Sequence, residues 1–215
     1  METSGDRPSQ ALFSAERAKA FTDAVVAIAM TLLILPLMES VGEAVKEGHG
    51  TLDWFLGELG PLFSFALSFV IIANLWVSHH RVFDGVKYVS EGLLWITIAW
   101  MFTIVWMPVA TALVGQMADD PLQKLLYIGT MLVASLLLAL TRLYLRAHPE
   151  LHDTDPVSLR RGLVAEFVTV FLFALALTLS ITIPGISYFP MFLLLLTRPL
   201  YGLVMRILPA KRPTG

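Results

Sequence analysis

The chain has 215 residues, of which 56% are hydrophobic and only 15% are charged. That composition excludes an ordinary soluble domain, in which about a quarter of the residues are charged. A formal net charge of −2 gives no reason to expect a nucleic-acid partner, and the absence of cysteine excludes a disulfide framework and a thiolate metal site. The composition therefore predicts an integral membrane protein.

Six long apolar segments, separated by short polar stretches, follow one another along the chain. They lie at residues 17–38, 54–83, 90–116, 123–146, 159–183 and 186–206. Each is a continuous run rather than the short alternating segment of a barrel strand, so we predict an all-α protein with six transmembrane helices. The polar segments 39–53 and 147–158 are predicted to be surface loops.

These segments define one transmembrane domain with a short tail at each end. The predicted parts are a cytoplasmic segment at 1–16, a six-helix domain at 17–206 and a cytoplasmic tail at 207–215. The first 16 residues lack the basic, apolar and small-residue pattern of a cleavable signal peptide, so the first helix is expected to be retained.

The basic residues predict the orientation in the membrane, because loops rich in Lys and Arg stay on the cytoplasmic side. With the N-terminus inside, only Lys46 and Lys124 fall outside. The cytoplasmic set is Arg7, Arg17, Lys19, Arg81, Lys87, Arg142, Arg146, Arg160, Arg161, Arg198, Arg206, Lys211 and Arg212. Six crossings with both termini cytoplasmic satisfy this pattern.

The first helix carries an apolar stripe when it is drawn with ~100° per residue. Ile28, Leu32 and Leu35 fall within about 60° of one another, with Thr31 at the margin and Phe21 extending the stripe toward the cytoplasm. Asp23 and Leu33 each lie about 140° from Ile28, so both are expected to face neighbouring helices. Taken alone, the stripe is also the pattern of an ordinary helix-packing face.

Charged and aromatic residues gather at the cytoplasmic ends of the first two helices. Arg17 and Asp23 are about 120° apart around the first helix and cannot easily pair with each other, whereas Lys19 is a possible partner of Asp23. In the second helix Trp76, His79, His80 and Phe83 have the spacing of one helix face. The alternatives are a polar network between the two helices and solvated interfacial residues.

Two motifs resemble known sequences. Arg17, Phe21, Thr22 and Asp23 resemble the R-x-x-x-F-S-D signature of the transmembrane protein 175 family of potassium channels, with Thr22 in place of serine. Trp76, His79, His80, Arg81 and Phe83 resemble the family's W-x-x-H-H-R-x-F ending of the second helix. The remaining helices match only in hydropathy.

The resemblance implies a cation channel of the bacterial, single-repeat type in the plasma membrane. Four copies would assemble as a homotetramer, with four first helices around a pore for monovalent cations and K⁺ preferred over Na⁺. The family's apolar constriction falls on Ile28, followed by Leu32 and Leu35, with Thr31 as a polar neighbour. An Arg, Asp and His network would join the first and second helices. No cofactor is implied.

The sequence lacks the features of other ion filters. The sequence TALVG at 111–115 resembles the carbonyl filter T-V-G-Y-G only loosely. No acidic residue lies in the middle of the apolar stripe of the first helix, so a ring of carboxylates is not available as a filter. A hydrophobic constriction remains, which selects modestly because K⁺ loses water more easily than Na⁺, and which can also gate by dewetting.

Other classes of protein explain fewer residues. A small secondary or proton-coupled transporter would use Glu166 and Arg198 as its site, but internal inverted repeats are not evident. An enzyme is not expected, because no nucleophile elbow or H-E-x-x-H motif occurs. His148 and His152 have helical spacing for a metal, but Pro149 interrupts them and we predict no metal site.

Overall fold

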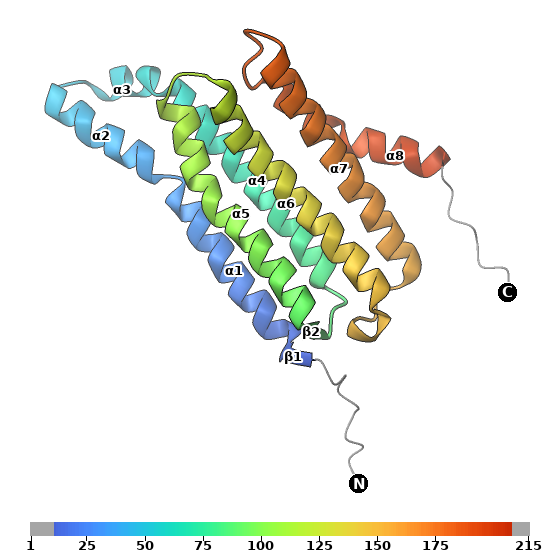
Figure 1. Ribbon diagram of the computed structural model, residues 1–215. Coiled ribbons are helices and arrows are strands. Elements are labelled where there is room, and N and C mark those ends of the chain that lie inside the picture. The colour runs from blue at the N-terminus through green and yellow to red at the C-terminus, as the bar shows by residue number, and fades with distance from the viewer. Residues whose placement is uncertain (1–10, 208–215) are drawn as a thin grey trace.

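Long helices arranged side by side form most of the chain in the computed structural model, which describes residues 11–207 (Figure 1). The predicted cytoplasmic residue Arg7 and the tail residues Lys211 and Arg212 lie outside the described part. The helices are α1 (Ala15–Leu32), α2 (Leu35–Glu47), α3 (Thr51–Gly57), α4 (Leu59–Phe83), α5 (Glu91–Gln116), α6 (Pro121–Ala147), α7 (Pro156–Thr182) and α8 (Thr197–Ile207), with 3₁₀ helices η1 (Pro149–Leu151) and η2 (Phe189–Leu196).

Six helical spans in the described residues are long and apolar enough to cross a membrane. They run over Ala15–Glu47, Leu59–Phe83, Glu91–Gln116, Pro121–Ala147, Pro156–Thr182 and Phe189–Ile207. Each contains most of one predicted segment, so the six-helix, all-α fold is confirmed.

The local sequence explains where α6 and α7 begin. Asp120 and Asp155 accept hydrogen bonds from backbone N–H groups in the first turns of these helices, and a proline opens each helix.

The first span differs from the prediction because it is broken. α1 ends at Leu32, and α2 begins at Leu35 with Pro36 in its first turn. Proline has no N–H to donate to the carbonyl four residues earlier, so the helix breaks there. The helix then resumes and continues to Glu47, where Gly48 ends it with a left-handed φ of 75°. The predicted surface loop at 39–53 is therefore wrong over most of its length.

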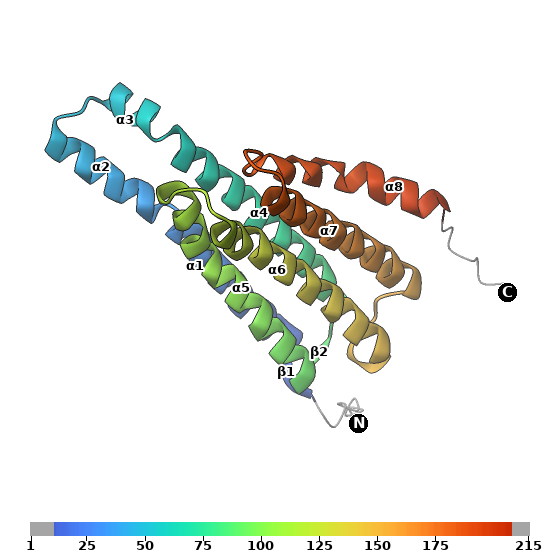
Figure 2. The ribbon, with the colours of Figure 1, turned by 45° about the horizontal axis from the view of Figure 1, so that its top comes forward.

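The last span also departs from a regular helix. It was predicted as one segment at 186–206, whereas the structure begins with the 3₁₀ helix η2 and changes to the α-helix α8 at Thr197. A turn with positive φ at Gly185 and Ser187 leads into it. η2 and α8 pack on α7 and lie at the edge of the bundle (Figure 2).

A small antiparallel sheet that the sequence did not predict ties the N-terminal end of α1 to the other connections. β1 (Ala11–Ser14) pairs with β2 (Tyr88–Ser90), and Val86 forms a bridge with His152. The Lys87 ammonium forms an ion pair with Asp153, and the hydrogen bond between them raises the pKa of Lys87. The connections from α4 to α5 and from α6 to α7 therefore meet at the same end of the bundle as the start of α1.

The core lies where α1, α4, α5 and α6 meet. α6 packs against α5 and α7, while α1 packs against α4 and α5, as both views of the ribbon show. Its largest buried side chains include Trp100, Tyr127, Ile104 and Met131. Three hydroxyl groups in the core are linked by hydrogen bonds: the Thr111 hydroxyl donates to Ser68 Oγ over 2.8 Å, and Ser68 shares a hydrogen bond with the Tyr127 hydroxyl over 2.8 Å.

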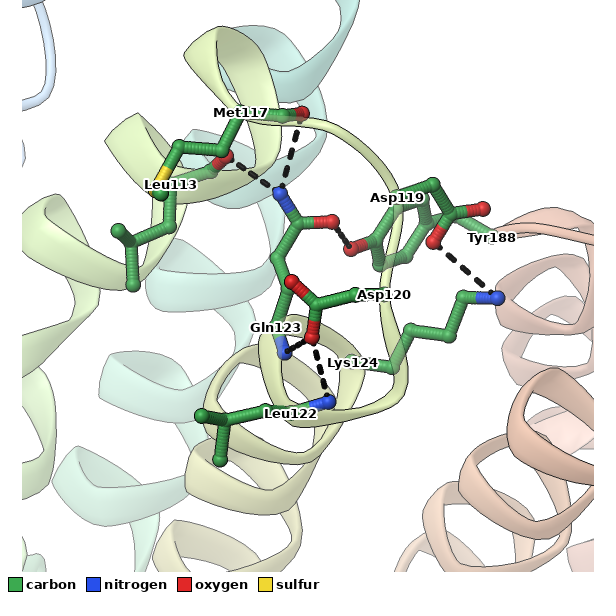
Figure 3. Close-up of polar contacts among 8 residues, drawn as sticks. All are labelled: Leu113, Met117, Asp119, Asp120, Leu122, Gln123, Lys124 and Tyr188. Atoms are coloured by element: carbon green, nitrogen blue, oxygen red, sulfur yellow. Dashed lines mark hydrogen bonds and ion pairs between the residues drawn. The ribbon is translucent and has the colours of Figure 1, made fainter.

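Gln123 joins three segments (Figure 3) near the start of α6, at the opposite end of the bundle from the sheet (Figure 1). Its amide nitrogen donates to the carbonyl oxygens of Leu113 and Met117 near the end of α5, at 2.5 and 3.3 Å. Its amide oxygen accepts a hydrogen bond of 2.7 Å from the Tyr188 hydroxyl, just before η2. Burial raises the pKa of Tyr188. This side chain therefore links α5, α6 and the start of the last span.

Candidate pore-lining helix and polar network

α1 has two faces of opposite character. Its buried face is formed by Thr22, Val26 and Ala29, followed by Leu33 with 2% of its surface exposed, and it packs on α4 and α5. The prediction that Leu33 faces neighbouring helices is therefore confirmed. The opposite face leaves Ile28 60% exposed. Phe21, Thr31, Leu32 and Leu35 are exposed along with it.

Asp23 contacts the second membrane span, as its position on the helix predicted. One oxygen of its carboxylate accepts a hydrogen bond of 2.7 Å from the indole N–H of Trp76 on α4. No ion pair between Asp23 and Lys19 is present in residues 11–207. A hydrogen bond to an ionised group is stronger than a neutral one, so this contact fixes the rotation of α1 against α4.

The aromatic and histidine residues of α4 divide between two environments instead of forming one shared face. His79 is buried, and its ring stacks between Phe83 and Trp100 with centroid distances of 4.5 and 4.3 Å. His80 is exposed and lies against Trp76 at 5.7 Å. The division follows from the helix period, since residues 79 and 80 point about 100° apart.

The rest of the predicted network is less connected. Arg17 is exposed, and the structure of residues 11–207 contains no hydrogen bond or ion pair from its side chain. The Thr22 hydroxyl donates to the backbone carbonyl of Ala18 over 2.9 Å. Within one copy of the chain, the Asp23 and Trp76 hydrogen bond is thus the polar link between α1 and α4.

Glu166 has a partner that the sequence did not identify. It is buried on α7, and its carboxylate lies 3.5 Å from Nε of Arg142 on α6, which is also buried. The guanidinium lies directly over Gly162, where a Cβ atom would collide with it. Arg198 is exposed on α8. An Arg within an apolar helix is the sequence signal that could have indicated this pair.

A cavity of about 490 Å³ lies beside the break between α1 and α2. Its lining comes from α2, α3, α4 and α5, from the break between α1 and α2, and from the connection between α3 and α4. Leu33 and Pro36 border it at the break, and Thr111 contributes from α5. Glu39, Glu43 and Glu58 lie around it, so the end of the bundle that carries few basic residues presents carboxylates next to the proposed pore helix.

No group of three or more His, Cys, Asp or Glu side chains in residues 11–207 is placed to hold a metal ion. His148 and His152 contact backbone carbonyls instead. Nδ1 of His148 lies 2.9 Å from the Tyr144 oxygen, and Nε2 of His152 lies 3.0 Å from the Leu145 oxygen. Both histidines therefore satisfy the carbonyl groups at the end of α6.

Six apolar spans, packed as a bundle with charged groups gathered at its ends, define a multi-pass membrane protein. Residues 17–108 match the family model described as endosomal/lysosomal potassium channel TMEM175. This segment contains both motifs, from Arg17 to Asp23 and from Trp76 to Phe83. The predicted resemblance to the transmembrane protein 175 family is therefore confirmed over residues 17–108.

Relatives from bacteria and animals agree with that match. The chain is 36% identical over 101 residues to a protein of Streptomyces collinus named as a potassium channel, covering 46% of this chain and 47% of that protein. A protein of Chryseobacterium with the same designation is 31% identical over 99 residues, covering 46% and 48%. The endosomal/lysosomal proton channel TMEM175 of Bos taurus is 43% identical over 88 residues, covering 38% and 18%. The chain thus spans about half the length of its bacterial relatives.

Proposed function

We propose that this protein is a potassium-preferring cation channel of the plasma membrane and not an enzyme. Four copies assemble as a homotetramer, and their α1 helices surround the pore. The observation that carries this proposal is the pair of opposed faces on α1. One face is buried in the chain's own bundle, and the other leaves an apolar stripe uncovered in the segment that matches the channel family.

Ile28 forms the constriction in this proposal. It is 60% exposed in one copy and lies opposite the buried face of α1. Four such side chains around an axis narrow the path until an ion sheds part of its water, and K⁺ sheds water more readily than Na⁺. Leu32 and Leu35 continue the lining outward, with Thr31 as a polar position. No fixed dipoles replace the lost water, so the preference for K⁺ is modest.

One end of the bundle carries carboxylates that attract cations. Glu39, Glu43 and Glu58 lie at the end of the bundle that carries α2, and carboxylates at the end of a pore raise the local cation concentration. In the proposed orientation this is the outer end, and both termini are cytoplasmic. A transporter using Glu166 and Arg198 has less support, because Glu166 is paired with Arg142.

The test is current through purified protein in planar bilayers with K⁺ on one side and Na⁺ on the other. We expect unitary currents whose reversal potential favours K⁺. Ile28→Ala should move the K⁺ to Na⁺ permeability ratio toward one and raise the conductance, because the ring widens. Native mass spectrometry should find four copies.

Leu33→Ala is the matched control, because it shortens a branched side chain on the buried face of the same helix. It should lower stability by about 3 kcal/mol and leave the permeability ratio unchanged. A shifted ratio for Leu33→Ala with none for Ile28→Ala would reject the proposed pore face. Saturating, gradient-coupled flux without unitary current would favour a transporter, and current carried by H⁺ alone would reject the K⁺ preference.

A further inference from the structure

The apolar stripe of α1 continues into α2 with the spacing of a coiled coil. Positions three and four residues apart alternate through the break between the two helices. We call this row the seam, and it consists of Ile28, Thr31, Leu35, Met38, Gly42 and Val45. The residues at both sides of the break have right-handed helical backbone angles, so the phase of the helix is approximately kept.

The seam is uncovered over its whole length. In α2, Met38 is 63% exposed and Val45 is 72% exposed. The opposite face of α2 is used within the chain: Leu37 and Ala44 are buried, and the Trp54 indole N–H donates to Ser40 Oγ over 3.0 Å. One side of α2 is therefore held by its own chain, and the apolar side has no cover in the described residues.

Length places the outer half of the seam beyond the lipid hydrocarbon. The first span has 33 residues. At ~1.5 Å per residue it is about 50 Å long, whereas the hydrocarbon layer is about 30 Å thick. Lys19 is the last basic residue at the proposed cytoplasmic end of this span, and Glu39 is the first acidic residue at its other end. The helix between them is ~30 Å long, which matches the hydrocarbon layer. Lipid chains therefore cannot cover Gly42 and Val45, and exposure of such a stripe to water is unfavourable.

We propose that α2 packs against α2 of other copies of this chain, so that the seam forms an outer neck around the same axis as the pore. This inference rests on the proposed tetramer and extends it beyond the membrane. The geometry favours a second copy of the chain as the partner that packs on the seam. In the proposed tetramer, the seam residues of α1 already face other copies, and the seam residues of α2 continue the same face. Gly42 has no side chain and lets the helices approach closely at its level.

The test uses single cysteines, which the natural sequence permits because it contains none. Val45→Cys in the full-length protein, in liposomes, should give disulfide-linked dimers under mild oxidation. Glu47→Cys is the control at the same height, since residue 47 lies about 160° away from the seam position 45. Glu47→Cys should give at least tenfold less dimer. Ile28→Cys reports on the proposed pore itself and should also cross-link.

The outcomes separate the two proposals. Cross-linking of Ile28→Cys without cross-linking of Val45→Cys would overturn the outer neck and leave the pore intact. If neither Ile28→Cys nor Val45→Cys cross-links, both the pore and the neck are overturned. Equal cross-linking of Val45→Cys and Glu47→Cys would indicate random collision and also overturn the neck.

As a second measurement, Val45→Glu should reduce the tetramer fraction in native mass spectrometry, because four carboxylates would meet at the axis, whereas Val45→Leu should preserve it. Equal tetramer fractions for both variants would contradict the neck.

Discussion

Single charged residues decide how α1 is held against the rest of the bundle. The Asp23 carboxylate lies within an apolar helix, where an ionised group requires a partner. It receives one hydrogen bond of 2.7 Å from Trp76, while the neighbouring His79 is enclosed by aromatic rings and forms no hydrogen bond or ion pair with Asp23 in the described residues. Within one copy of the chain, the hydrogen-bond partner of the Asp23 carboxylate is thus the Trp76 indole.

Trp76→Phe should therefore destabilise the protein, because it keeps the ring packing and removes the donor to Asp23. We expect a loss of about 2 kcal/mol, in the range of a hydrogen bond to a charged group. Asp23→Asn should cost less, since the amide still offers an oxygen. Thermal unfolding followed by circular dichroism measures both. Trp95→Phe is the control, because Trp95 is 62% exposed, and an equal shift for it would contradict the role of the hydrogen bond.

At the scale of helices, α6 and α7 are joined by a buried charge contact. Both helices lie wholly beyond the segment that matches the family, and Arg142 and Glu166 form a contact between them. Gly162 provides the space that the guanidinium occupies. A pair of buried charges depends on both members, because the remaining one is left uncompensated when its partner is removed.

Glu166→Gln should lower the free energy of unfolding by about 3 kcal/mol, because it leaves Arg142 buried without a counter-charge. The double variant Arg142→Leu with Glu166→Leu should lose less, since no isolated charge remains. Arg161→Gln, on the exposed face of α7, serves as the control and should change stability little. Denaturant unfolding in detergent measures the three variants. A double variant that loses as much stability as Glu166→Gln, or more, would contradict the cost of an uncompensated charge.

For the whole molecule, charge is distributed between the two ends of the bundle. Arg17, Arg81 and Arg146 lie at the ends of α1, α4 and α6 that meet near the small sheet. Glu39, Glu43 and Glu58, which line the cavity, lie at the opposite end. Because basic loops remain in the cytoplasm, this separation supports an inward-facing sheet and an outward-facing α2.

Two single cysteines should react from opposite sides of the membrane. Glu47→Cys at the end of α2 should be labelled from outside by an impermeant maleimide, and Glu150→Cys in η1 only after the inside is opened. Glu47 is preferred over Gly48, whose φ of 75° would strain any residue with a side chain. Labelling of both from the same side would contradict the six-crossing arrangement.

The sequence by itself determined the six spans, the two charged ends and the two faces of α1. These features depend on local quantities: the length of an apolar run, the positions of Lys and Arg, and the ~100° rotation per residue of a helix. For that reason Ile28 and Leu33 could be assigned to opposite faces before any contact was known. Neither the break at Pro36 nor the continuation of the helix to Glu47 was predicted.

Only the tertiary structure decided which distant residues meet. Trp76 reaches Asp23, Trp100 covers His79, Arg142 pairs with Glu166, and Tyr188 donates to Gln123. Each contact joins two segments whose relative rotation and height depend on the packing of all their side chains. Hydropathy cannot specify these values, because every face of a membrane helix can be apolar whether it meets protein or lipid.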